Sequence, residues 1–141
     1  MKKLITYILL LSIAFSFTAC AAANQPVTDL AAFEEQVLAD WVERKNESIK
    51  LPHKFDVFRY YGTDNGYHII LFRLEGPHTT DTVSKSIAGY TFDQLGAGRQ
   101  LMAYKNGEFI DLQIAYFFRM VSKDAITKAA ELHAEKKNST E

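Results

Sequence analysis

This sequence contains almost no cysteine and has no excess of either positive or negative charge. One cysteine in 141 residues excludes a disulfide within the chain. The 16 basic and 17 acidic side chains nearly balance, which argues against the basic surplus typical of nucleic-acid-binding proteins. The length suits one domain rather than a two-domain enzyme. What is present is a globular composition, with 48% hydrophobic and 13% aromatic residues against 23% charged ones.

Motifs of familiar catalytic and metal sites are missing as well. The sequence contains no His-Glu-x-x-His and no Gly-x-Ser-x-Gly, and its four histidines, His53, His68, His78 and His133, are not spaced like metal ligands. Gly96-Ala97-Gly98 precedes an expected strand rather than a helix, so we interpret it as a strand connection and not as a phosphate loop. The sequence therefore predicts no metal and no cofactor, and it identifies no catalytic residue.

The N-terminal segment has the pattern of an export signal. Lys2 and Lys3 precede fourteen uncharged residues, Leu4 to Phe17. As a helix this run would span roughly 21 Å, which is short of the roughly 30 Å hydrocarbon core of a bilayer. We therefore assign residues 1–19 to a signal peptide that is removed, rather than to a membrane anchor.

The single cysteine, Cys20, stands at the end of this segment, after Phe17-Thr18-Ala19. These residues resemble the lipobox of bacterial lipoproteins, with Phe17 where leucine is usual. The resemblance implies that Cys20 receives a diacylglyceryl thioether, becomes the first residue of the mature chain and carries acyl chains such as palmitate. A lone thiol is otherwise unusual in an exported protein, where cysteines generally pair. Cleavage within Ala19 to Ala23 without lipidation is the alternative.

A lipid on Cys20 determines where the protein is expected. Two or more acyl chains would hold it stably at the outer face of the cell membrane, or at the outer membrane of a Gram-negative cell. Removal of residues 1–19 leaves fourteen basic and seventeen acidic side chains, a formal charge of −3. A surface of that sign has no general attraction to nucleic acid. The expected partners are therefore the membrane, through the lipid, and an unidentified protein or envelope ligand.

The mature chain is predicted to form one α+β domain over residues 28–136. Residues 20–27 are small and polar and read as a tether, and residues 137–141 are expected to be a frayed tail. The predicted domain has an N-terminal helix, a four-stranded antiparallel meander and two short C-terminal helices. It is large enough to bury a core without disulfides.

Local patterns predict the three helices. Apolar residues three, four and seven positions apart predict the first helix, from Thr28 or Asp29 to about Lys45, with Trp41 on its buried stripe. Asp111 can cap a short helix that runs through Arg119. Ser122 begins the last helix, on which Ile126, Ala129, Ala130 and His133 share one face.

Aromatic and β-branched residues predict the strands. The expected strands span residues 55–61, 67–74, 86–92 and 99–105, followed by a short strand at 108–110. A turn-forming loop at 62–66 joins the first two into a hairpin, and Asn106-Gly107 is a strong two-residue turn signal. The polar stretch 75–85, which contains Gly76-Pro77, is expected to be the longest loop inside the domain.

The first hairpin holds the candidate binding residues, which are Arg59, Tyr61, Tyr67, His68 and Arg73. Both of its faces are apolar, so each must be covered, or one is a binding surface. Mid-strand arginines could grip a carboxylate or an envelope polymer beside aromatic rings. The simpler interpretation, which we favour, is that Arg59 and Arg73 reach past apolar neighbours to pair with surface acids.

Strict alternation also predicts which side chains share a face of this hairpin. If Tyr61 lies opposite Tyr67, then Phe55 shares the face of the two arginines. Asp56 and His68 then lie together on the other face.

Five short motifs follow one another along nearly all of the mature chain. They are Ala39-Asp40-Trp41, Tyr61-Gly62-Thr63-Asp64-Asn65-Gly66, Tyr104-Lys105-Asn106-Gly107-Glu108-Phe109, Leu112-Gln113-Ile114-Ala115-Tyr116 and Ser122-Lys123-Asp124. In this order they resemble a family of small exported bacterial lipoprotein domains of unknown function, common in Gram-positive anaerobes. Ile114 departs from an acid frequent in the family, and Arg119-Met120-Val121 replaces a frequent Gly-Leu-Leu link. The resemblance implies an α-β-β-β-β-α-α domain and supplies no catalytic residues.

These observations favour a non-enzymatic binding or interaction module at the cell surface, acting through one side of its sheet or through the polar loop. Two alternatives stay open. The first is a small envelope hydrolase whose site combines His68, Asp56 and the loop at 75–85. The second is an inhibitor of a secreted enzyme, suggested only by analogy with the helix-on-sheet folds of cystatins and β-lactamase inhibitors.

Overall fold

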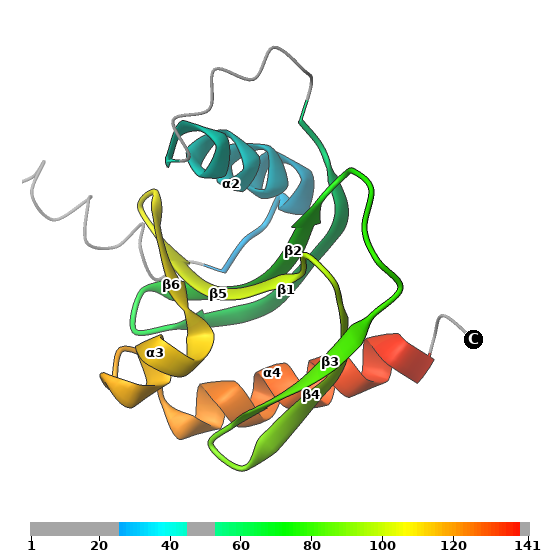
Figure 1. Ribbon diagram of the computed structural model, residues 1–141. Coiled ribbons are helices and arrows are strands. Elements are labelled where there is room, and N and C mark those ends of the chain that lie inside the picture. The colour runs from blue at the N-terminus through cyan, green and yellow to red at the C-terminus, as the bar shows by residue number, and fades with distance from the viewer. Residues whose placement is uncertain (1–25, 45–52, 139–141) are drawn as a thin grey trace, which may run out of the picture.

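The computed structural model describes residues 26–44 and 53–138 and confirms an α+β fold. In chain order (Figure 1), the elements are α2 (Leu30–Arg44), β1 (Phe55–Asp64), β2 (Tyr67–Leu74), β3 (Thr82–Ile87), β4 (Tyr90–Gly96), β5 (Gln100–Lys105), β6 (Glu108–Asp111), α3 (Leu112–Phe117) and α4 (Lys123–Asn138). The predicted signal peptide, Cys20 and most of the tether lie outside the described residues. Within those ranges, none of the helices combines the length and apolar character needed to cross a bilayer.

The strands form two sheets rather than the predicted single meander. Four antiparallel strands pair in the order β1-β2-β5-β6, and β3 pairs with β4 alone. The stretch 86–92, predicted as one strand, contains the β3–β4 turn, where Ala88 and Gly89 have φ of 55° and 84°. Alanine rarely adopts a positive φ, so the sequence gives no warning of this turn.

Two β-bulges in β1 change which side chains share a face of the first hairpin. The register with β2 shifts between Phe55 and Val57 and again between Tyr60 and Gly62, so Asp56 and Tyr61 are the extra residues. A bulge reverses the alternation beyond it. The predicted faces are therefore wrong in part: Phe55 lies on the α2 side, and Asp56 points toward Arg73.

The turn between β1 and β2 is also tighter than predicted. Asp64 pairs with Tyr67, so the connection is Asn65-Gly66 alone and not a loop over 62–66. Both turn residues have positive φ, 51° and 78°, as a two-residue type I′ turn requires.

Both faces of the four-stranded sheet are covered, which answers the question raised by its two apolar sides. Helix α2 lies on one face, and α4 lies with the β3–β4 hairpin on the other (Figure 1). The buried cluster under α2 consists of Phe33, Val37, Trp41, Ile70, Phe72, Tyr104 and Phe109. The cluster on the opposite side includes Tyr61, Ile69, Leu71, Phe92, Leu101, Leu112 and Ile126.

The predicted helix caps are confirmed. The Asp111 carboxylate accepts hydrogen bonds from the backbone N–H groups of Gln113 and Ile114 at the start of α3. Ser122 Oγ accepts from the backbone N–H of Ala125 at 3.2 Å and begins α4. Helix α4 continues to Asn138, two residues beyond the predicted end of the domain.

We expect Asp111→Ala to lower the free energy of unfolding by about 1 kcal/mol or more, because it removes this cap. The same carboxylate pairs with Nζ of Lys85, a partly exposed ion pair that adds little. Asp111→Asn keeps a good capping side chain and loses only the ion pair, so it should retain most of the stability in urea unfolding. Equal losses in both variants would contradict the capping role.

Candidate functional site

Three arginines from different parts of the chain line one cavity of about 580 Å³. Arg59 comes from β1 and Arg73 from β2, while Arg99 lies in the turn before β5. The other residues that line the cavity come from the segment before β3, from β3 and β4 themselves, and from α4. They are Thr79, Thr80, Asp81, Thr82, Asp93, Gln94, Gly96 and His133. The cavity thus lies where the first hairpin, the end of β4 and α4 meet.

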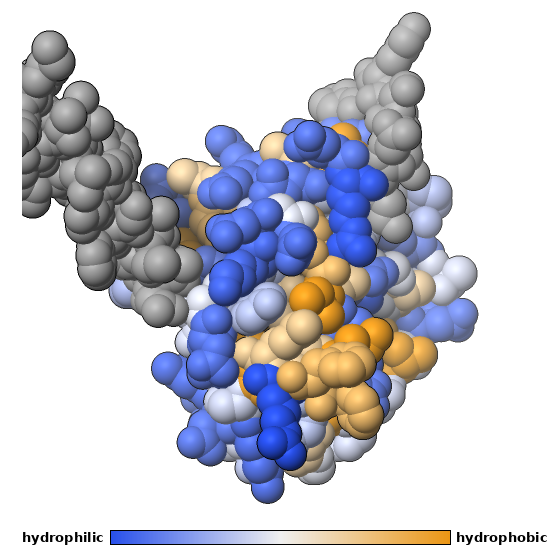
Figure 2. Space-filling model, turned by 90° about the vertical axis from the view of Figure 1, so that its left-hand side faces the viewer, coloured by the Kyte–Doolittle hydropathy of each residue, from blue (hydrophilic) through white to orange (hydrophobic). Residues whose placement is uncertain are grey.

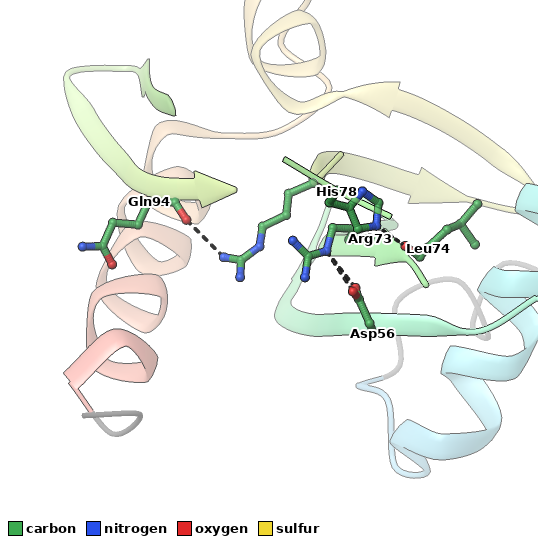
Figure 3. A network of polar contacts seen from close by, with 6 residues as sticks. Asp56, Arg73, Leu74, His78 and Gln94 are labelled. Atoms are coloured by element: carbon green, nitrogen blue, oxygen red, sulfur yellow. Dashed lines mark hydrogen bonds and ion pairs between the residues drawn. The ribbon is translucent and has the colours of Figure 1, made fainter. Parts of the chain in front are cut away.

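Arg73 is paired with a carboxylate at the edge of this cavity. Its Nε donates to both oxygens of Asp56, at 2.9 and 3.1 Å (Figure 3). The hydrogen bond from Arg73 lowers the pKa of Asp56. This pair agrees with the simpler interpretation of the mid-strand arginines.

Arg99 is the residue that sequence reasoning missed. Its Nη1 donates to the carbonyl oxygen of Gln94 at 3.1 Å, whereas its buried Nε has no hydrogen-bond partner in the described part of the chain. Burial lowers the pKa of Arg99, and the charges of Arg59 and Arg73 lower it further. Three cations and the carboxylates of Asp56, Asp81 and Asp93 therefore lie at or beside this cavity.

The backbone at Gly96 lies close to two of these guanidinium groups. A Cβ atom at Gly96 would lie 3.5 Å from Nη1 of Arg73 and 3.7 Å from Nε of Arg99. One position is therefore in van der Waals range of both groups. The Gly96-Ala97-Gly98 segment does connect two strands, as predicted, and its first glycine also forms part of the cavity wall.

A buried hydrogen-bonded chain joins β1, α4 and β4. The Tyr61 hydroxyl is 2.8 Å from Nδ1 of His133, and Nε2 of His133 is 2.8 Å from the carbonyl oxygen of Asp93. Because a carbonyl only accepts, Nε2 must carry the proton, and the Tyr61 hydroxyl donates to Nδ1. Burial raises the pKa of Tyr61, although the charge and hydrogen bond of Arg59 act in the opposite direction.

The other two predicted site residues lie elsewhere. His68 packs 4.8 Å from the ring of Phe33 on the α2 face, and its Nδ1 is 3.2 Å from Oγ1 of Thr63. Tyr67 packs against the opposite core, with Nζ of Lys105 5.0 Å from its ring centroid. The sheet therefore separates His68 from Asp56 and the arginine cavity, and the hydrolase site that would combine them is not assembled.

The position of His68 predicts a pH dependence of stability. Burial lowers the pKa of His68 below its usual 6.5, so the folded protein resists its protonation. Its contribution is fully present above about pH 6.5 and is lost as the pH falls through the folded-state pKa. We expect His68→Phe to reduce the loss of stability between pH 7 and pH 5 in urea unfolding. An unchanged pH dependence would show that other groups cause the loss.

A separate apolar surface surrounds α3. Ile114, Phe117 and Phe118 are 51, 78 and 64% exposed. This apolar area is visible in Figure 2, which faces the side of the molecule where α3 lies. None of the three residues lines the arginine cavity.

No group of three or more His, Cys, Asp or Glu side chains that could hold a metal ion occurs in residues 26–44 and 53–138. Comparisons with protein-family models, with curated proteins and with solved structures found no match to this chain. Its function must be argued from the cavity itself.

Proposed function

We propose that this chain is a lipid-anchored extracytoplasmic binding module, rather than an enzyme, and that it holds an anionic ligand in the arginine cavity. The observation that supports this most directly is the convergence of Arg59, Arg73 and Arg99 on one cavity that has room for a ligand. The carboxylate of Asp56 is paired with one of these groups, that of Arg73.

Arg99 explains why a ligand is needed there. A buried guanidinium nitrogen without a partner costs free energy, and the neighbouring cations add to that cost. An anion in the cavity would remove both penalties at once, because charge-assisted hydrogen bonds to arginine are strong and directional. These two features support a partner of negative charge.

The binding part of the proposal is tested by thermal unfolding with a panel of small anions at constant ionic strength. A ligand that binds the folded state alone raises the unfolding midpoint. We expect at least one anion to raise it for the parent protein and not for Arg99→Gln. A panel that stabilises neither protein, or both equally, would refute the proposal.

The anchoring part depends on Cys20, which lies outside the described residues. We expect Cys20→Ser to move the protein from the membrane fraction to the soluble extracytoplasmic fraction, because it removes the thiol that accepts the lipid. Metabolic labelling with palmitate gives a second readout. If the variant stays membrane-bound and the parent protein takes up no label, lipidation is the wrong explanation.

A further inference from the structure

Helix α3 has two apolar faces. Leu112 and Ala115 are buried and contribute to the core. Ile114, Phe117 and Phe118 are exposed and together form what we call the α3 surface. The two phenylalanine rings meet edge to face at 5.2 Å, and hydrophilic residues border the apolar area in Figure 2. Contiguous exposed apolar side chains, unlike scattered ones, mark an interaction surface.

The turn that ends α3 fixes this exposure. The backbone N–H of Met120 donates to the carbonyl oxygen of Ala115 at 2.9 Å. The backbone N–H of Arg119 donates to the carbonyl oxygen of Tyr116, also at 2.9 Å. These bonds form a Schellman motif, in which glycine usually takes the left-handed position. Here Arg119 takes it, with φ of 59°, a conformation that is unfavourable for a residue with a Cβ atom. The backbone therefore places a cation directly after the two exposed rings.

A second cation lies at the same end of the molecule. Phe117, Arg119 and Lys123 line one hollow of about 510 Å³, and both charged residues of its lining in the described part of the chain are cations. Two acids are near: Asp64 accepts from a backbone N–H before α4, and Asp124 follows Lys123. Aromatic rings next to arginine and lysine suit a bilayer interface, where the rings enter the headgroup region and the cations meet lipid phosphates.

The length of the chain before the fold places a bilayer on the same side of the molecule. Pro26 is the first described residue, and the six residue steps from Cys20 to Pro26 can span at most about 22 Å. Val27 already packs against the cluster under α2, so the fold holds the chain from there. In Figure 1 the first described residues lie toward the left, as α3 does. A lipid on Cys20 would therefore keep this side close to the membrane.

We propose that the α3 surface docks on the bilayer that holds the lipid anchor, with its two aromatic rings among the headgroups and with Arg119 and Lys123 against lipid phosphates. The argument from chain length rests on the proposed anchoring at Cys20, whereas the composition of the α3 surface does not. A lipid alone leaves the domain free to turn. The second attachment fixes which side of the domain faces the membrane.

A tryptophan placed on the α3 surface tests this docking. Protein purified from membranes of cells that express the full chain is reconstituted into vesicles of equal parts phosphatidylcholine and phosphatidylglycerol, with ordinary or brominated acyl chains. Phe117→Trp is the reporter. Val83→Trp is the matched control, because Val83 is 62% exposed near the start of β3. Trp41 is buried and contributes equally to both variants.

We expect bromine to quench Phe117→Trp at least about twofold more than Val83→Trp, since a docked apolar face lies about 5–10 Å into the headgroup and acyl boundary. Equal quenching of the two variants overturns the docking. An emission shift of Phe117→Trp that depends on protein concentration and not on bromine indicates a second copy at the α3 surface, and it overturns the bilayer assignment too.

Palmitate label in the same preparation reports the anchor separately. Labelled protein with equal quenching overturns the docking and leaves the anchor intact. Unlabelled protein that keeps the difference in quenching supports the docking and refutes the anchor. Protein that does not bind the vesicles at all refutes both.

Arg119→Gly separates docking from folding. Glycine suits the φ of 59° at this position, so the unfolding midpoint should stay the same or rise. Loss of the cation should lower the ratio of docked to undocked protein by about fivefold, which reduces the quenching of Phe117→Trp. Lys54→Gln removes an exposed cation outside the α3 surface and should leave the quenching unchanged. Equal quenching in the two variants overturns the role of Arg119.

Discussion

Trp41→Ala is expected to lower the free energy of unfolding by about 3–5 kcal/mol. Trp41 is 8% exposed, and its ring meets those of Phe72 and Phe109 edge to face at 4.9 and 5.0 Å. It is one of three buried side chains by which α2 contacts the sheet, together with Phe33 and Val37. Removal of the largest of them leaves a cavity that a short helix cannot close.

The measurement is urea unfolding followed by circular dichroism, because the variant lacks the chain's only tryptophan. Leu30→Ala is the control in the same helix, since Leu30 is 46% exposed and should cost little. Similar losses in both variants would show that α2 does not depend on Trp41. The cavity lies on the other side of the sheet, so the folded fraction of Trp41→Ala should still bind the anion.

The elements predicted correctly are those whose signals are local. The apolar stripe containing Trp41 gives α2, and the side-chain caps Asp111 and Ser122 give the starts of α3 and α4. Asn106-Gly107 gives the turn between β5 and β6. Each of these patterns works through neighbours within one or two turns of chain, which a single sequence displays directly.

The errors arise where backbone irregularity decides the outcome. Strict alternation placed Asp56 with His68, but the bulge between Phe55 and Val57 turns Asp56 toward Arg73. The turn at Ala88 lies inside an unbroken β pattern. Neither feature has a reliable residue signature, since a bulge depends on packing against both faces of the sheet.

The candidate site could be predicted only in part for a related reason. Arg59 and Arg73 were identifiable because a charge in mid-strand is unusual. Arg99 follows a glycine in a polar turn, and its relation to the other two depends on the separate β3–β4 hairpin. His133 appeared as one residue of an apolar helix face. A polar ring on a buried helix face must meet a hydrogen-bond partner, and this requirement could have marked His133 in the sequence.

That partner is Tyr61, and Tyr61→Phe is expected to cost about 1–3 kcal/mol of stability. The ring packing would remain, but Nδ1 of His133 would lose the hydroxyl that donates to it at 2.8 Å. His133 is 3% exposed, so water cannot readily replace the lost donor. Chemical unfolding of the purified variant measures the loss. A change below about 0.5 kcal/mol would place the variant within the range of ordinary surface substitutions and contradict this role.

A double-mutant cycle separates the hydrogen bond from packing. His133→Leu removes the acceptor and strands the buried Tyr61 hydroxyl, so alone it should be at least as costly as Tyr61→Phe. The double variant leaves neither group unsatisfied, and we expect its cost to be smaller than the sum of the two single costs. Additive costs would mean that the two side chains act independently. Coupling matters for the site because the bond joins β1 to α4, the two elements that supply Arg59 and His133 to the cavity wall.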